Sequence, residues 1–420
     1  MSFNIPGLLE GTGVALSIFL IIFLIRKSWK MYTVLALASV VLVITNGNSI
    51  NANVNILYHS LTSSTAYFLV TMVITITLLG NLHQKVGAME KLVCNLRFII
   101  RDPRALLMVF PAVISLFSTV PGGAIISAPM VEETGRELKM SRIELAVSNM
   151  VYRHLVVLIT PFNSSLILIS GITGISIASY LGFTIPVIVM VFLLATIWIY
   201  FKYPKIKKAD DDNLTRGKRK EAFFELLINA SPYIVAISLG LIFNIYFPLA
   251  LCCGIVITFF LNLPSEGIAA ELKKRLLLFI KGFNWPIALS TLSIVIYKDY
   301  MIESESFFQA VNSLVEFGFP VMALLIVFPF ITGFITGNNT ASLGICLPVL
   351  IPLLGPDMLS VKYFGLVYLS SYAGYLGSPI HLCTYLTNEY FQTPMYSLIK
   401  NVNVYGAIML LLGFTLSLFY

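Results

Sequence analysis

Two apolar stretches with the same interruption constrain the fold of this chain more than any other feature. The first reads FPAVISLFSTVPGGAIISAPMV from Phe110, and the second reads FPFITGFITGNNTASLGICLPVL from Phe328, 218 residues later (328 − 110). In each, glycine and small polar residues separate two apolar runs, and a proline closes the second run. A repeat preserved at prolines and turn residues indicates duplicated architecture. In a membrane protein, paired interrupted apolar segments in two halves are the best sequence indication of a transport site.

Composition places most of the chain in a lipid bilayer. Hydrophobic residues make up 58% and charged residues 11%, with a mean hydropathy of +0.89, whereas soluble domains carry about 25% charged residues. The first apolar stretch, from Leu8 to Ile25, lacks the basic start and the small-residue cleavage site of a removable signal peptide, which predicts a first transmembrane helix. The five cysteines show no metal-ligand spacing, which predicts small core residues.

Basic residues predict how the chain is threaded through the membrane. Most Lys and Arg fall in short segments between apolar stretches, and positive loops stay on the cytoplasmic side. This pattern predicts a multi-pass protein of the cell membrane with its N- and C-termini outside. The division of the charge among short loops argues against nucleic-acid binding as the reason for the net charge of +7. The main basic segments are residues 26–30, 85–104, 136–142, 202–220 and 273–281.

The predicted fold is an all-α polytopic membrane protein with an inverted-topology repeat. Each half is expected to contain five transmembrane helices, one of them broken, and one re-entrant helical hairpin. A charged cytoplasmic linker over residues 202–222 separates a first repeat, 1–201, from a second, 223–420. The unbroken spans are expected near 8–25, 31–45, 65–82, 185–200, 229–246, 248–263, 283–297 and 403–419, and the polar segment 46–64 is expected to be an outside loop.

The interrupted segments are the unusual parts of each half. Residues 104–135 are predicted to form a hairpin that opens to the cytoplasm, because basic loops flank it on both sides. Residues 319–354 are predicted to form the matching hairpin that opens outside. Broken helices follow over 143–175 and 361–393. Because each half has an odd number of true crossings, the second half is expected to be inverted with respect to the first.

The chemistry of these breaks predicts a binding site. A proline removes a helical hydrogen bond, and free backbone groups persist in hydrocarbon only when they are buried in protein or line a wet cavity. Carbonyl and hydroxyl oxygens suit a small cation, whereas half-helix N-termini suit an anion. Kinks or tight helix-packing sites are the alternative for any single break. The candidate substrate- and ion-binding residues are Ser118, Thr119, Gly122, Gly123, Asn163, Ser164, Gly337, Asn338, Asn339, Thr340, Ser378 and His381, with helix breaks at Pro161 and Pro379.

Two ionisable positions lie next to these breaks. Arg153 is placed to attract an anionic substrate, with a snorkelling side chain or a pair with Glu144 or Glu133 as the alternative. His381 is placed to bind substrate or carry a proton, and a hydrogen bond to a backbone carbonyl is the alternative for it.

The second hairpin tip resembles a known family of transporters. Asn338-Asn339-Thr340-Ala341-Ser342, followed by Pro348, resembles the Ser-Asn-Thr signature of divalent anion/sodium symporters. The whole chain resembles the wider ion transporter superfamily, which includes citrate and arsenite permeases. The resemblance implies a homodimer that works by an elevator motion, with Asn339 and Thr340 binding sodium and a substrate carboxylate. In the first tip, Thr119, Val120 and Pro121 stand where that family has Ser, Asn and Thr.

These observations predict a secondary active transporter without a cofactor. It would move a small anionic solute, a carboxylate or an oxyanion, coupled to sodium or protons by alternating access. One alternative is a sodium/proton antiporter without an organic substrate. A second is an intramembrane enzyme with Ser118 or Ser378 as nucleophile and His154 or His381 as base. No GxxxxGK[ST] pattern is present, so ATP is not expected to drive the chain directly.

Overall fold

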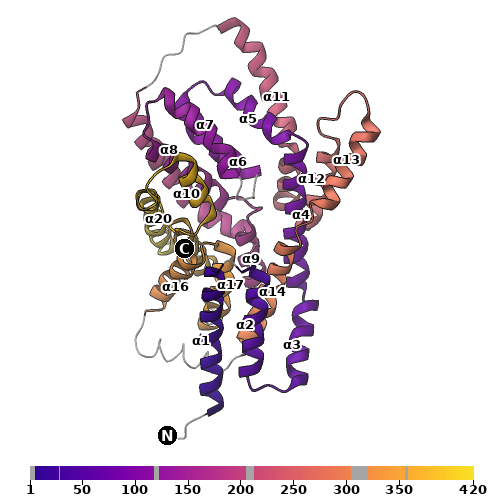
Figure 1. Ribbon diagram of the computed structural model, residues 1–420, viewed down its shortest axis with the longest axis vertical. Helices are drawn as coiled ribbons and strands as arrows, with labels where there is room; N and C mark the ends of the chain where they lie inside the picture. Colours follow the sequence, from indigo (N-terminus) through magenta and orange to yellow (C-terminus); the bar gives the residue numbers. More distant parts are fainter. Residues whose placement is uncertain (1–4, 28, 118–122, 205–211, 304–319, 355–357) are drawn as a thin grey trace.

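The structure, a computed structural model, describes residues 5–27, 29–117, 123–204, 212–303, 320–354 and 358–420, and regular structure in these ranges is helical throughout (Figure 1). The first half contains α1 (Ile5–Arg26), α2 (Met31–Thr45), α3 (Ile50–Thr62), α4 (Ser64–Lys85), α5 (Ala88–Ile99), α6 (Pro103–Phe117), α7 (Gly123–Glu137), α8 (Arg142–Leu158), α9 (Ser164–Thr173) and α10 (Ile177–Lys202). The second half contains α11 (Asp212–Ile237), a π-helical turn η1 (Ser238–Ile242), α12 (Phe247–Phe260), α13 (Ile268–Lys281), α14 (Trp285–Ile302), α16 (Val321–Thr336), α17 (Asn339–Leu353), α18 (Val361–Leu376), α19 (Leu382–Phe391) and α20 (Met395–Ser417).

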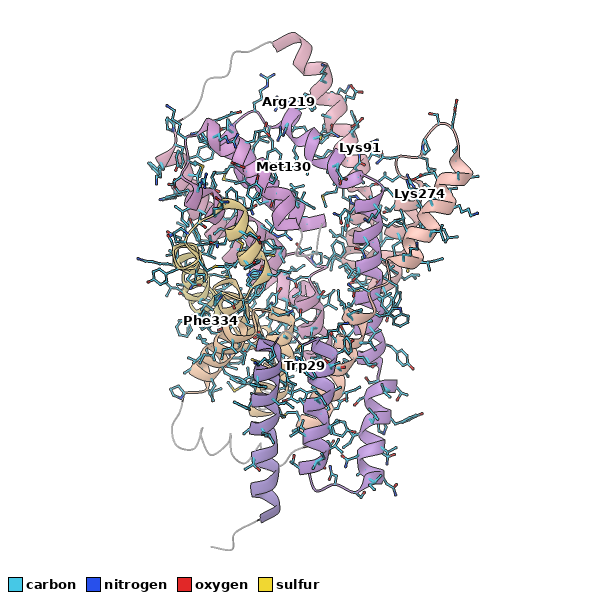
Figure 2. All side chains as sticks on the ribbon, viewed as in Figure 1. Trp29, Lys91, Met130, Arg219, Lys274 and Phe334 are labelled. Atoms are coloured by element: carbon cyan, nitrogen blue, oxygen red, sulfur yellow. The ribbon has the colours of Figure 1, made fainter. Side chains whose placement is uncertain are left out.

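The described helices have the length and surface of a multi-pass membrane protein. Large apolar side chains such as Phe201 and Ile44 are exposed, which suits lipid rather than water. Figure 2 shows Lys91, Arg219 and Lys274 toward one end of the molecule, opposite the end at which α1 begins. Five described segments are long and apolar enough to cross a membrane, namely Ser64–Lys85, Ile177–Lys202, Gly217–Ile242, Ile268–Ile302 and Met395–Ser417.

The order and spacing of helices in the first half recur in the second. The pair α8 and α9, interrupted at residues 159–163, is matched by α18 and α19, interrupted at 377–381. Both ends of α19 lie 218 residues after the ends of α9 (382 − 164 and 391 − 173). The hairpin helices α6 and α7 are matched by α16 and α17, which begin 218 and 216 residues later (321 − 103 and 339 − 123).

Several helices lie where the sequence predicted loops or linkers. Helix α3 lies inside the predicted outside loop 46–64, and Ser49 caps it by accepting a hydrogen bond from the Ala52 amide. Helices α5 and α13 were not predicted either, because each is amphipathic and too polar to read as a membrane span. Helix α11 begins inside the predicted linker 202–222, since its Lys, Arg and Glu residues are good helix formers.

The helices that carry the breaks pack closely with one another. Helix α16 lies along α18, and α6 lies along α8. The contact between α16 and α18 is made by backbone at two glycines. A Cβ at Gly333 would lie 2.2 Å from the Ser371 carbonyl oxygen, and one at Gly374 would lie 2.0 Å from the Phe330 carbonyl oxygen. Helices α2, α4, α12 and α14 contact one another in a second group, and α17 and α9 meet between the two groups.

Candidate functional site

The tip between α16 and α17 is a two-residue turn that brings the second hairpin against the second break. Gly337 adopts φ +58°, a left-handed conformation that glycine accommodates at low cost. The Asn338 side chain then caps α17 by accepting a hydrogen bond of 3.0 Å from the Ala341 amide. A Cβ on Gly337 would lie 2.7 Å from Ile380 and 3.1 Å from the His381 backbone nitrogen. The turn therefore requires glycine both for its φ angle and for its contact with residues 380–381.

The first turn of α17 joins the hairpin to both halves of the chain. The Asn339 amide oxygen accepts a hydrogen bond of 2.6 Å from the Ser371 hydroxyl on α18. The Thr340 hydroxyl lies 2.9 Å from the Ser165 hydroxyl on α9. The buried Asn339 amide nitrogen has no hydrogen-bond partner among the described residues. A buried donor of this kind is costly unless it meets an acceptor, so Asn339 has a donor available for a bound ligand.

The first break is held by the side chain of Asn163. This side chain caps α9 by accepting a hydrogen bond of 2.9 Å from the Ser165 amide. Its amide nitrogen donates to the Val157 carbonyl at 3.0 Å, which satisfies one of the carbonyls freed at the end of α8. Pro161 is buried within the same turn. Asn163 thus ties the two ends of the broken helix together and points the N-terminus of α9 inward.

The second break is arranged differently. His381 occupies the position that caps α19, but its side chain makes no capping hydrogen bond. Its Nε2 instead lies 3.2 Å from Nε2 of His154, and its Nδ1 lies 3.2 Å from the Thr384 hydroxyl. The sequence left open a hydrogen bond from the His381 side chain to a backbone carbonyl. The contacts of this side chain are instead with His154 and Thr384. The Tyr375 ring packs on His381 with the ring centroids 3.9 Å apart.

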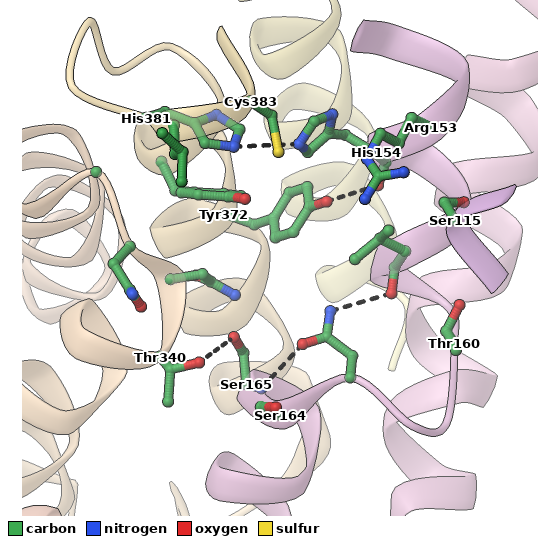
Figure 3. A pocket seen from close by; sticks show the side chains of 17 residues that line it. Ser115, Arg153, His154, Thr160, Ser164, Ser165, Thr340, Tyr372, His381 and Cys383 are labelled. Atoms are coloured by element: carbon green, nitrogen blue, oxygen red, sulfur yellow. Dashed lines mark hydrogen bonds between the residues drawn. The ribbon is translucent and has the colours of Figure 1, made fainter. Parts of the chain in front are cut away.

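Most of the predicted site residues line one cavity of about 300 Å³ (Figure 3). Two predicted residues of the second break do not: Ser378 is buried outside the lining, where its hydroxyl is 3.4 Å from the Ile380 amide, and Pro379 is exposed. Ser378 does not line the cavity because the turn at residues 377–381 directs its hydroxyl to its own backbone. The predicted residues that do line the cavity are Arg153, Asn163, Ser164, Gly337, Asn338, Asn339, Thr340 and His381.

The predicted residues of the first hairpin tip have a different outcome. Ser118, Thr119 and Gly122 lie outside the described residues. Gly123 is the first residue of α7. Ser115, near the end of α6, lines the cavity although the sequence did not single it out.

Arg153 brings a permanent positive charge to the cavity. It lies on α8, is only 3% exposed and lines the cavity, so it does not snorkel to an interface. The two acids considered as its partners are engaged elsewhere, because Glu144 pairs with Lys202 and Glu133 pairs with Arg97. The Arg153 guanidinium instead lies close to Cys383 in the cavity lining.

Tyr372 and Cys383 complete this wall and were not singled out as site residues, whereas His154 was considered only as the base of an intramembrane enzyme. Tyr372 donates a hydrogen bond of 2.7 Å to the His154 carbonyl, which fixes α18 against α8. Cys383, which the sequence predicted as a core residue, lines the cavity next to His154 and His381. The sequence did not indicate that His154 and His381 would lie together, since they are 227 residues apart.

Three helix N-termini meet at this cavity. The first residues of α9, α17 and α19 all contribute to its lining. Each N-terminus carries roughly half a positive elementary charge from the helix dipole, and the first backbone N–H groups of a helix have no partner within the helix itself. Together with Arg153 they make the cavity electropositive and rich in hydrogen-bond donors, which is the arrangement that binds an anion.

Comparison with known proteins shows where this architecture occurs. A family described as "Protein of unknown function (DUF401)" matches residues 12–419. The chain belongs to this family. No curated protein sequence matches the chain. Among solved structures, the YdaH transporter of Alcanivorax borkumensis, reported to have an unusual topology, matches with a TM-score of 0.55 and 14% identity over 87% of this chain and 88% of that one. At this identity the likeness shows a shared fold.

Proposed function

We propose that this DUF401 protein is a secondary active transporter that moves a small anionic solute across the cell membrane by alternating access. The convergence of Arg153 and three helix N-termini on one cavity carries this proposal. Anions are stabilised by the N-terminal ends of helix dipoles and by charge-assisted hydrogen bonds to a guanidinium. A cavity of about 300 Å³ suits a solute of a few non-hydrogen atoms, such as a carboxylate or an oxyanion.

The donors in the cavity favour an anion over a neutral solute. Arg153 has only donors, and the orphaned amide nitrogen of Asn339 is a donor as well. No Asp or Glu occurs among the described residues that line the cavity, so no carboxylate there opposes an anionic solute. A carboxylate or oxyanion would accept from both Asn339 and Arg153.

Sodium is the coupling ion that we propose first. Asn339 and Thr340 would supply an amide oxygen, a hydroxyl and adjacent carbonyls at the second hairpin tip. The Thr340 and Ser165 hydroxyls, 2.9 Å apart, add neutral oxygens from the two halves at one point. Protons are the second candidate, because His154 and His381 lie in the same wall and imidazole can take up and release a proton.

The proposed mechanism follows the resemblance to the ion transporter superfamily. The two halves would form an inverted repeat, and the basic end of the molecule would face the cytoplasm, with both termini outside. The recurrence of the helix bounds after 218 residues supports the repeat, and the grouping of both hairpins with both broken helices suits a moving transport domain. We further propose that the protein is a homodimer and that this domain moves as an elevator.

Uptake and ligand stabilisation by an Arg153→Gln variant test the proposal directly. The purified protein is screened for thermal stabilisation by carboxylates and oxyanions, with and without sodium, because a ligand that binds the folded state raises the melting temperature. The stabilising anion is then used for uptake into liposomes. Loss of a charge-assisted contact of about 1.5–3 kcal/mol would weaken anion binding roughly 10- to 150-fold in the variant.

Arg136→Gln is the matched control, because it removes the same charge from an exposed side chain. Unchanged anion affinity in Arg153→Gln would refute the proposed site. A response to sodium and pH with no response to any anion would favour the sodium/proton antiporter instead. Release of a chemically altered solute would favour an intramembrane enzyme. Of its two candidate nucleophiles, Ser378 does not line the cavity and Ser118 lies outside the described residues.

A further inference from the structure

Three potential metal ligands come together in the wall of the cavity. His154 lies on α8 in the first half, whereas His381 and Cys383 lie at the start of α19 in the second half. All three side chains are buried, and their ligand atoms lie within 4.8 Å of one another. Figure 3 shows the Cys383 sulfur between the two imidazole rings. Apolar packing alone does not explain why two histidines and a thiol face one another here.

The hydrogen bonds around the two rings suit metal ligation. The Nδ1 atom of His154 lies 2.7 Å from the Met150 carbonyl, which can only accept, so Nδ1 carries the proton and Nε2 presents its lone pair. His381 Nδ1 faces the Thr384 hydroxyl, which can either donate or accept. His381 can therefore also place its proton on Nδ1 and present Nε2. Such outer hydrogen bonds are what orients metal-binding histidines.

The spacing of the ligand atoms fits a tetrahedral ion. Zinc–nitrogen bonds of roughly 2.0–2.1 Å hold two tetrahedral nitrogens about 3.3–3.4 Å apart. The two Nε2 atoms are 3.2 Å apart. A thiolate bonded to the same ion at about 2.3 Å would lie about 3.6 Å from each nitrogen. Since the present separations are at most 4.8 Å, a small adjustment of the Cys383 side chain brings its sulfur to that distance.

We propose that His154, His381 and Cys383 form a binding site for a transition-metal ion of the zinc type, with a fourth position open to the cavity. Imidazole and thiolate ligands select such ions over Mg²⁺ and Ca²⁺, which require oxygen ligands. Binding forms a metal–sulfur bond and releases the thiol proton to solvent.

The bound ion would also act on the solute. One divalent cation, one thiolate and Arg153 give this wall a net charge of +2, compared with +1 from Arg153 beside a neutral thiol. An anion at the open fourth position would bind the metal directly. This second step rests on the proposed transport function, whereas metal binding itself does not.

Metal binding is tested on the full-length purified protein after treatment with a chelator, in the absence of any solute. Titration with Zn²⁺ is expected to show one site per chain, and Co²⁺ is expected to give the absorption bands of a tetrahedral ion with a thiolate ligand. His154→Asn, His381→Asn and Cys383→Ser should each lower the Zn²⁺ affinity at least about 100-fold, since even an outer hydrogen bond is worth 10- to 100-fold. Cys383→Ser should also abolish the thiolate-to-cobalt band.

Matched controls come from the same chain. His83 is a buried histidine on α4 and Cys346 a buried cysteine on α17, both outside the cluster, so His83→Gln and Cys346→Ser should keep full affinity. The adjacent exposed cysteines Cys252 and Cys253 are replaced together as a second control. The proposal is overturned if no Zn²⁺ binds, if the Cys252/Cys253 variant abolishes binding, or if the three cluster variants bind as the unchanged chain does. None of these outcomes bears on whether an anion is transported.

Discussion

The two halves of this molecule use equivalent positions for different purposes. Asn163 at the first break and His381 at the second are 218 residues apart and occupy the same place before a ten-residue helix (381 − 163). Asn163 uses its side chain to cap α9 and to hold Val157, whereas His381 makes no cap and faces His154. The first break therefore maintains the backbone, and the second contributes a chemically active side chain to the cavity.

The contacts between hairpin and broken helix differ in the same way. In the second half, Gly333 and Gly374 let α16 and α18 touch through backbone. The equivalent residues of the first half are Ser115 and Val156, which have side chains, and Ser115 lines the cavity. The comparison teaches that the two halves can have equivalent helix bounds while residues at equivalent positions contribute differently to the site.

The largest effect is expected from Gly374→Ala. Its new Cβ would lie 2.0 Å from the Phe330 carbonyl oxygen and 2.9 Å from the Phe334 nitrogen, so the two helices must separate. Overpacking of this kind costs about 3 kcal/mol or more, because backbone cannot move aside as a flexible side chain can. The measurement is the free energy of unfolding in detergent.

Gly182→Ala provides the control, since its Cβ would find its nearest atom, the Tyr420 hydroxyl oxygen, 3.8 Å away. In this helical position alanine should be neutral or should stabilise the fold by up to about 1 kcal/mol. Equal stability of the Gly374→Ala and Gly182→Ala variants would contradict the close backbone contact between α16 and α18.

Exchanging Asn163 and His381, one variant at a time, should have an intermediate effect on the free energy of unfolding. Asn163→His removes the cap of α9 and the bond to Val157, and we expect a loss of about 1–2 kcal/mol in the free energy of unfolding. His381→Asn introduces the first half's residue at a position that has no side-chain cap, so its cost should be smaller. Chemical denaturation of both variants measures the difference.

The same exchange separates stability from function. His381→Asn should lose the stabilisation by Zn²⁺ that the unchanged chain shows, whereas Asn163→His should keep it despite its lower stability. If His381→Asn proved the more destabilising variant and kept the response to Zn²⁺, the two breaks would not differ in the way their hydrogen bonds indicate.

The sequence predicted the breaks better than the site built around them. Pro161, Pro379 and the Gly337-Asn338 turn are local signals, and the helices end near them because proline and a left-handed glycine act on their own backbone. The helices α2, α6, α7, α16 and α17 lie in the apolar runs of the sequence for the same kind of local reason. Helices α3, α5 and α13 were not predicted, because polar residues divide each of these helices and leave no long apolar run in the sequence.

The cluster of His154, His381 and Cys383 had no such local signal. Its members come from two helices that packing brings together. The residues next to each histidine in the sequence give no indication that the two histidines meet. Ser378 shows the same limit, since a hydroxyl at a break was expected to face the cavity and Ser378 is not among the lining residues. Its direction depends on the backbone angles of the turn, which residue type alone does not determine.

The smallest effect is expected where the two halves touch through single hydroxyls. Thr340 on α17 and Ser165 on α9 share one hydrogen bond of 2.9 Å, and a neutral hydrogen bond contributes about 1 kcal/mol. Thr340→Val should therefore lower the free energy of unfolding by about that amount, whereas Thr340→Ser should not. Thr415→Val is the matched control, because the exposed Thr415 hydroxyl bonds only to the Leu411 carbonyl of its own helix.

A double-mutant cycle with Ser165→Ala isolates the bond between Thr340 and Ser165, and we expect a coupling energy of about 0.5–1 kcal/mol. Strictly additive effects would show that Thr340 and Ser165 stabilise their own helices separately, and that the second hairpin tip is not tied to the first break.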